Sequence, residues 1–349
     1  MFIILGQLVS LTGCLKTLPS DSTETVINSK PKGLMYFDFF DTVSTIYSYA
    51  GDEQEKFEQN CNDVTTLLRE YHQLFDIYNE YSQINNLCTI NKNAGGDPLI
   101  VDQKLIDFLL YCKGIYTLTN GETNVMFGAV LKPWHDERTN ATQNPSSAKV
   151  PDMDLLIENN KNTDIDSLEI DDENNTVRIT NPNASIDVGA LGKGYATEKA
   201  ANLLESMGVT SYVLNIGGNI RIIGTKQDGS GWVTGITNPH DKSSYAAYMN
   251  LSNTSCVTSG DYERFYTVDN IKYHHIIDKD TLMPAEHFSS ITVITKDSGL
   301  ADALSTALFC MSYEEGLSLV ESISDVDVLW IFKDGSQKFT EGVNLVERT

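Results

Sequence analysis

The chain has 349 residues and a formal net charge of −23, with 41% hydrophobic and 21% charged residues. This length and composition are those of a globular protein with a sizeable core, built as one large unit or two lobes. The acidic excess repels nucleic acid and anionic membrane surfaces, and no cluster of Lys and Arg offsets it. Nucleic acid is therefore excluded as a partner.

The N-terminal segment has the pattern of a bacterial lipoprotein signal. Residues 1–9 are largely apolar and lead into Leu-Thr-Gly-Cys at 11–14, a stretch too short to span a bilayer, although no Lys or Arg precedes it. We expect a signal peptide over 1–13, lipidation of Cys14, and a flexible tether over 14–33, because residues 16–33 are rich in Ser, Thr, Pro and Lys. The alternative is a buried strand with a chance cysteine.

The first half of the chain is predicted to form one strand and two helices, followed by a polar loop. Residues 36–49 alternate and are rich in β-branched and aromatic side chains, which predicts a strand that ends at a turn near Gly51. Apolar spacing predicts helices over 52–75 and 102–118. The many Asn, Ser and Pro residues of 136–152 indicate a loop.

The second half is predicted to be mostly short strands. They are expected at 177–179, 185–188, 212–216, 220–223, 231–237, 273–277 and 290–295, with helices at 195–206 and 299–311. A last hairpin pairs 326–332 with the segment after Lys338 and turns at Asp334-Gly335. The pattern indicates a mixed α+β protein with largely antiparallel sheets and packed helices.

Residues 185–198 form the most informative segment. Asp187 leads into Gly189, Gly192 and Gly194, with Lys193 between the last two, directly before a helix. Glycines let the backbone approach a ligand, and amide groups at a helix start, together with a lysine, suit phosphate oxygens. The spacing fits neither the P-loop nor the dinucleotide fingerprint. Alone, the segment fits equally well as a tight turn that packs a helix on a sheet.

Five ordered blocks place this segment in a wider pattern. The blocks are Tyr-Asn-Glu-Tyr-Ser-Gln-Ile-Asn at 78–85, Asp-Val-Gly-Ala-Leu-Gly-Lys-Gly-Tyr-Ala at 187–196, Leu-Asn-Ile-Gly-Gly-Asn-Ile at 214–220, Thr-Ser-Gly-Asp-Tyr-Glu-Arg-Phe at 258–265 with His-His-Ile-Ile-Asp at 274–278, and Ala-Asp-Ala-Leu-Ser-Thr-Ala at 301–307. Together they resemble the FAD:protein FMN transferases, the ApbE-type flavin transferases. The resemblance implies a two-lobed, T-fold-like catalytic unit over 34–349.

Asp302 and Thr306 are candidate metal ligands. They are four residues apart on a predicted helix, so they share one face, and their oxygens suit Mg²⁺. Alone, such a pair is an ordinary polar helix edge. The resemblance implies that both residues bind Mg²⁺ with the main-chain carbonyl of Ala190, and that Ser305 contributes.

The resemblance also implies a binding site for FAD. Lys193 and backbone groups near Gly189 would hold the pyrophosphate. Asp187 either contacts the nucleotide or caps the following turn, and Tyr78 and Phe40 either flank the flavin or pack in the core. The other implied contacts are Glu122, Thr123, Asn124, His275 and Ile276. Asn124 and Met126 replace an Asp and a Thr of the family pattern, which puts the hydrogen bonds of this loop in doubt.

For catalysis, the resemblance singles out His275 and Asp278. Neighbouring residues on a strand point to opposite faces, so His274 or His275 is expected to be structural. His275 aligns with the family histidine and is the candidate base, because a histidine suits deprotonation of a hydroxyl. Asp278 would orient or replace it, and Lys193 would assist. Residues 279–284 lack a proline and a glycine of the family pattern.

The implied reaction is Mg²⁺-dependent transfer of FMN from FAD to a Thr or Ser hydroxyl of a protein, with release of AMP. The expected acceptors are subunits of membrane redox complexes, reached by a lipid-anchored enzyme on the extracytoplasmic face of the cell membrane. Two alternatives remain open. One is an FAD pyrophosphatase that yields FMN and AMP, and the other is a lipoprotein that binds flavin without catalysis.

Overall fold

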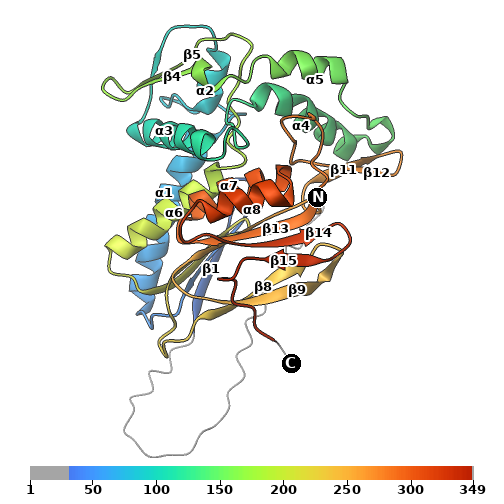
Figure 1. The fold of residues 1–349 in the computed structure, drawn as a ribbon. Coiled ribbons are helices and arrows are strands. Elements are labelled where there is room, and N and C mark those ends of the chain that lie inside the picture. Colours follow the sequence, from blue (N-terminus) through green and yellow to red (C-terminus); the bar gives the residue numbers. More distant parts are fainter. Residues whose placement is uncertain (1–30, 348–349) are drawn as a thin grey trace, which may run out of the picture.

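The computed structural model describes residues 31–347 (Figure 1). The predicted signal peptide, Cys14 and most of the predicted tether lie outside these residues. The first strand, β1 (Lys32–Phe39), begins within the range predicted as tether, so residues 32 and 33 belong to the folded unit. No helix in the described part of the chain is both long enough and apolar enough to cross a membrane.

The main sheet of the described chain is antiparallel throughout. Its eight strands lie in the order β1-β2-β6-β7-β10-β13-β14-β15. After β1, their bounds are β2 (Thr42–Ser48), β6 (Ser211–Ile216), β7 (Asn219–Gly224), β10 (Ser255–Gly260), β13 (Phe288–Thr295), β14 (Asp327–Phe332) and β15 (Gln337–Phe339). The predicted antiparallel α+β class is confirmed.

Both faces of this sheet are covered. On β14, Val328 and Trp330 belong to the core cluster beneath the helices, whereas Leu329 and Ile331 belong to the cluster beneath the hairpin of β8 (Trp232–Asn238) and β9 (Asp241–Leu251). This alternation follows from the two-residue period of a strand. The apolar run of β14 is therefore buried on both sides.

Helices cover the sheet as a second layer, and further helices and small sheets lie beyond them (Figure 1). The layer on the sheet contains α1 (Gln54–Phe75), α6 (Gly192–Ser206), α7 (Ser298–Cys310) and α8 (Tyr313–Glu321). Beyond it lie α2 (Leu87–Lys92), α3 (Gln103–Leu118), α4 (Gly128–Gln143), α5 (Met153–Asn160), the sheet of β3 (Leu99–Ile100), β5 (Thr176–Ile179) and β4 (Leu168–Asp171), and the hairpin of β11 (Phe265–Val268) and β12 (Ile271–His274). The helices predicted at 52–75, 102–118, 195–206 and 299–311 are all present.

The prediction of one strand over 36–49 is wrong. The chain reverses at Phe40 and Asp41, which have φ values of 53° and 50°, and β1 pairs with β2 as a hairpin in which Phe39 faces Thr42. Two positive φ values match the twist of a two-residue hairpin turn. The sequence did not indicate this turn, because neither residue is the Asn or Gly that such turns favour.

Three further predictions differ from the structure. The strand predicted at 273–277 is observed as β12 at Ile271–His274, so His275 lies beyond its end. The segment predicted as a polar loop from 136 is helical as far as Gln143, because α4 buries Val130, Trp134 and Ala141 on one face and leaves its polar residues toward solvent. The strand predicted at 185–188 is reduced to one bridge between Ser185 and Phe127. This segment therefore enters the site as a loop.

Candidate active site

The glycine-rich segment forms the loop before α6 and its first turn. Gly192, Lys193 and Gly194 open the helix. A Cβ atom at Gly194 would overlap Asp302 Cβ and the carbonyl oxygen of Ser298. Only glycine therefore lets α6 approach α7 this closely. This contact brings Lys193 and Asp302, predicted from distant motifs, to the same place.

Asp302 is the buried carboxylate of the site. It is 4% exposed, and its Oδ2 accepts a hydrogen bond from Gly194 N at 2.8 Å and lies 3.7 Å from Lys193 Nζ. Burial raises the pKa of Asp302, and the charge of Lys193 opposes that rise. Oδ1 makes no hydrogen bond within residues 31–347 and remains available to a ligand.

The other predicted metal ligands differ in burial and in whether their oxygen atoms already make hydrogen bonds. Ser305 is fully buried, and its hydroxyl donates to Asp302 O at 2.9 Å and contacts Ser259 Oγ at 2.7 Å. Thr306 is half-buried and shares the helix face of Asp302, while Ala190 is half-buried in the loop before α6. Ser305 therefore supports the site, and Asp302, Thr306 and the Ala190 carbonyl are its candidate donors.

These donors fit a magnesium ion. They are hard oxygens that include a single carboxylate, and Mg²⁺ is commonly bound by one or two carboxylates, water and substrate phosphates. Within residues 31–347 no group of three or more His, Cys, Asp or Glu is placed to hold a metal. A metal here would thus complete its shell with phosphate oxygens and water.

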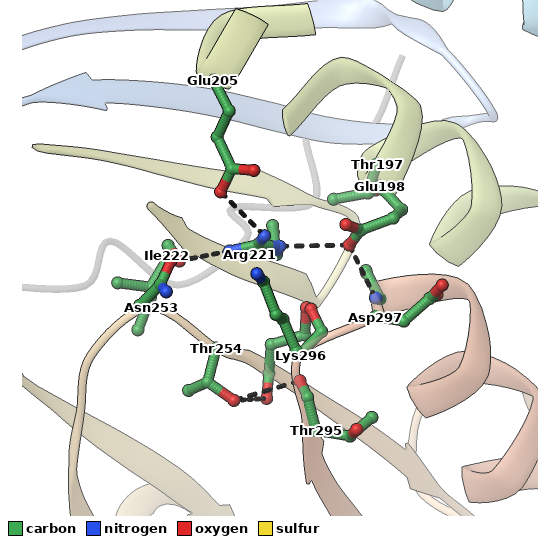
Figure 2. A network of polar contacts seen from close by, with 12 residues as sticks. Thr197, Glu198, Glu205, Arg221, Ile222, Asn253, Thr254, Thr295, Lys296 and Asp297 are labelled. Atoms are coloured by element: carbon green, nitrogen blue, oxygen red, sulfur yellow. Dashed lines mark hydrogen bonds and ion pairs between the residues drawn. The ribbon is translucent and has the colours of Figure 1, made fainter. Parts of the chain in front are cut away.

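A buried ion-pair network lies behind the site (Figure 2). Arg221 of β7 is fully buried and contacts Glu198 at 3.1 Å and Glu205 at 3.0 Å, both on α6. Glu198 also accepts a hydrogen bond from Ser298 N at 2.9 Å, at the start of α7. Burial raises the pKa of Glu198, and the charge of Arg221 opposes that rise. One network therefore fixes α6, α7 and the sheet relative to one another.

The two adjacent histidines have different surroundings, and His275 lies just beyond the end of β12 rather than on a strand. His274 is 4% exposed, accepts from Ile276 N at 3.3 Å through Nδ1, and contacts Ala285 O at 2.8 Å through Nε2. His274 is thus structural. His275 Nδ1 is buried and has no hydrogen-bond partner among the described residues. Burial, followed by the charges of Arg264 and Arg138, lowers the pKa of His275 well below its ordinary value, so His275 is neutral at neutral pH.

The loop after His275 is fixed by Asp278 and Lys279. Asp278 Oδ1 accepts hydrogen bonds from Asp280 N and Thr281 N, both at 2.8 Å, and no hydrogen bond joins it to His275 in the described chain. Lys279 Nζ lies 3.2 Å from Glu122 Oε1. Asp278 therefore shapes the loop, and Glu122 links this loop to the one that contains Thr123 and Asn124.

The side chains of Thr123 and Asn124 form hydrogen bonds to other segments of the chain. Thr123 is 2% exposed, and its hydroxyl donates to Ala303 O at 3.0 Å on α7. The Asn124 side chain donates to Thr163 O at 2.8 Å and accepts from Met126 N at 2.9 Å. Asn124 can make this last bond as well as an aspartate would. The departure from the family pattern is therefore compatible with an ordered loop.

Asp187 both caps the turn and faces the site. Its Oδ1 accepts from Gly189 N at 2.8 Å, and its Oδ2 lies 3.7 Å from His135 Nδ1. The hydroxyl of Tyr78 is 3.3 Å from the same His135 nitrogen, and Tyr78 is 63% exposed. Burial lowers the pKa of His135, and the charge of Asp187 opposes that shift. An exposed ring beside this cluster matches the predicted flavin contact better than core packing.

Phe40 lies in the β1–β2 turn. Its ring packs edge-on against His72 of α1 with centroids 5.6 Å apart, and its amide donates to His72 Nδ1 at 3.3 Å. Phe40 also packs against the main hydrophobic core. The core-packing alternative therefore accounts for the contacts that Phe40 makes in this structure.

Sequence reasoning missed three residues of the site. His135 and Arg138 are three residues apart on α4, within or next to the segment predicted as a loop, and Arg264 directly precedes β11. Arg264 stands inside the fourth sequence block, which was a usable signal. No local sequence pattern indicated His135 or Arg138, because their position depends on the packing of α4 against the β11–β12 hairpin.

These features define a class of protein. The antiparallel α+β fold joins a glycine-rich helix start to a buried aspartate and a neutral histidine, in a setting suited to phosphate. The profile of the ApbE family matches residues 40–330.

The curated relatives and solved structures agree with this match. FAD:protein FMN transferase of Treponema pallidum is 30% identical over 86% of this chain and 85% of its own. The Vibrio cholerae enzyme of that name is 27% identical over 97% of this chain and 95% of its own. The ApbE protein of Thermotoga maritima has a TM-score of 0.78 and 27% identity, covering 89% of this chain and 97% of its own. The chain belongs to the ApbE family.

Proposed function

We propose that this protein transfers FMN from FAD to a Thr or Ser hydroxyl of a target protein and releases AMP. The name shared by its relatives, FAD:protein FMN transferase, supports this reaction. The observation that carries the proposal is the convergence of Lys193 Nζ and Gly194 N on buried Asp302, at 3.7 and 2.8 Å from its Oδ2. A helix start, a lysine and a carboxylate with a free oxygen form a setting suited to a diphosphate.

In the proposed reaction, the acceptor hydroxyl oxygen forms a bond to the FMN phosphorus. The bond from that phosphorus to the bridging oxygen breaks, and AMP leaves with this oxygen. The hydroxyl proton passes to His275, which is neutral and has an unpaired buried nitrogen. Lys193 binds phosphate oxygens, and Gly194 N and Ser305 keep Asp302 and its helix in place.

Asp302, Thr306 and the Ala190 carbonyl would hold Mg²⁺. The ion, when bound, supplies positive charge that stabilises the phosphate oxygens during transfer. We also propose that Cys14 is lipidated, that the enzyme is anchored at the extracytoplasmic face of the cell membrane, and that its acceptors are subunits of membrane redox complexes.

Products distinguish the proposed reaction from its alternatives. The protein without residues 1–14 is incubated with FAD and Mg²⁺, with and without an acceptor, and the flavin and nucleotide products are identified by mass spectrometry. AMP that forms only when acceptor is present supports transfer. Free FMN and AMP in both samples indicate a pyrophosphatase, and bound, unreacted FAD indicates a flavin-binding protein.

A further inference from the structure

Tyr78 is exposed, yet both its backbone and its hydroxyl make contacts. It lies in the loop between α1 and α2 and is 63% exposed. Its amide donates to Asp76 Oδ1 at 2.7 Å, and its hydroxyl lies 3.3 Å from His135 Nδ1. Asp76 Oδ2 also accepts from the hydroxyl of Tyr81 at 2.9 Å, which fixes the loop. An exposed side chain ordinarily moves among several rotamers, so these contacts restrict the orientation of the Tyr78 ring.

His135 is itself held by its neighbours. The preceding residue of α4, Trp134, is 3% exposed and anchors this part of the helix. The His135 side chain is 22% exposed, and its Nδ1 lies 3.7 Å from Asp187 Oδ2. Asp187 is fixed in turn, because its Oδ1 accepts from Gly189 N at 2.8 Å. A nearby carboxylate favours the tautomer with the proton on Nδ1, and this proton is available to the oxygen of Tyr78.

His135 thus connects three segments that are far apart in the sequence. They are the loop of Tyr78, helix α4, and the loop from Asp187 that leads into Lys193 and α6. A mostly exposed ring gains little free energy of folding from burial, so stability alone explains this arrangement poorly. A ring that is open to solvent and fixed at its hydroxyl can instead accept a flat ring against its face.

We propose that His135 is a positioning residue, which through the hydroxyl of Tyr78 holds the ring in the orientation on which the flavin ring of FAD stacks. This proposal deepens the proposed function and rests on it for the identity of the ligand. Tyrosine and phenylalanine are then not equivalent at position 78, although both present an aromatic face. The contact with Asp187 also sets the stacking ring relative to the loop that leads into Lys193.

Binding of two fragments of FAD tests the proposal without requiring turnover. Affinities for riboflavin, which has the flavin ring but no phosphate, and for ADP, which has no flavin, are measured for the wild type, Tyr78→Phe, His135→Leu, the double variant and His135→Asn. Quenching of flavin fluorescence reports stacking on an aromatic side chain. Tyr245→Phe is the matched control, because Tyr245 is 40% exposed and lies on β9, across the main sheet from the helices (Figure 1).

The expected result is a selective and non-additive loss of flavin binding. We expect Tyr78→Phe and His135→Leu each to weaken riboflavin by about 2-fold to 10-fold, the contribution of one hydrogen bond, with less quenching and with ADP unchanged. The double variant should lose no more than either single variant, because both remove the same contact. His135→Asn, whose amide lies close to the position of Nδ1, should restore part of the loss, and Tyr245→Phe should bind as the wild type does.

The other outcomes overturn the proposal. Additive losses in the double variant would show that His135 does not act through Tyr78, as would unchanged riboflavin affinity and quenching in both single variants. Equal losses for riboflavin and ADP would assign the contact a role in folding, and a loss for ADP alone would place the adenine on Tyr78. If the selective, non-additive loss is found but the wild type transfers no FMN, the proposed function fails while the positioning role of His135 stands.

Discussion

The backbone amide of Gly194 donates a hydrogen bond to Asp302 Oδ2 at 2.8 Å, which joins the first turn of α6 to the middle of α7. The two residues are 108 positions apart. The bond fixes one carboxylate oxygen, while the other carries no hydrogen bond within the described chain. The glycine-rich segment and the aspartate motif thus form one structural unit.

This contact makes Gly194 sensitive to a single methyl group. We expect Gly194→Ala to destabilise the protein by about 1–3 kcal/mol, because the new Cβ would overlap Asp302 Cβ and Ser298 O. Denaturant unfolding measures the change. Gly114→Ala in α3 is the control, since a Cβ there has no neighbour within 4 Å. It should stabilise by about 0.5–1 kcal/mol, and equal losses in both variants would contradict the argument.

The pH dependence of the rate reports on His275. Burial and the charges of Arg264 and Arg138, with smaller effects of His274 and Lys193, lower the pKa of His275 well below 6.5. The neutral form, which accepts the proton, therefore persists as the pH falls through 6.5. We expect the rate to fall only at clearly lower pH. A half-maximal rate near pH 6.5 would show that this base has an ordinary pKa.

Substitution separates His275 from Asp278. We expect His275→Gln to lower kcat by about 10²–10⁴-fold, the usual contribution of a general base. Asp278→Asn keeps an oxygen that can accept from Asp280 N and Thr281 N, so its effect should be much smaller. Steady-state kinetics measures both variants, and the reverse order would make Asp278 the base.

His274 should make the folded state sensitive to acid. Burial lowers the pKa of His274 to about 4, so between pH 6.5 and 4 the unfolded chain binds a proton that the folded chain does not. The free energy of unfolding should therefore fall as the pH falls, by about 3 kcal/mol at most from this group. In His274→Gln this component should be absent. Parallel pH profiles for the wild type and the variant would refute the assignment.

The buried network predicts that loss of Arg221 destabilises the protein more than loss of Arg178. Arg221→Met leaves Glu198 buried without its cation and should destabilise the protein by about 3–5 kcal/mol. Arg178→Met removes a half-exposed ion pair with Glu169 and a hydrogen bond from Arg178 Nε to Gly96 O at 2.9 Å, and should destabilise the protein by only about 1–2 kcal/mol. Denaturant midpoints compare the two, and similar losses would show that the network adds little.

Local patterns predicted the parts of the site that depend on local geometry. The spacing of Asp302 and Thr306 follows from the helical period, and both residues lie on α7. The strand alternation expected for His274 and His275 does not apply, because β12 ends at His274 and His275 lies beyond it.

Other parts depend on packing between distant segments. The turn at Phe40 and Asp41 lacks the residues that normally favour such a turn. The polar residues of α4 resemble those of a loop, and only the packing of its apolar face identifies the segment as a helix. The packing of Trp134 on Tyr273 joins α4 to the β11–β12 hairpin, which is far away in the sequence. No sequence window contains that information.

The mass of an acceptor protein tests the central claim most directly. A redox-complex subunit known to carry phosphoester-linked FMN is incubated with FAD, Mg²⁺ and either the wild type or Asp302→Asn, and its intact mass is measured. We expect one FMN to be added by the wild type, and the yield to fall by at least about 10²-fold with Asp302→Asn. An unmodified acceptor with the wild type, whether FAD remains intact or is cleaved to FMN and AMP, would contradict the proposed transferase activity.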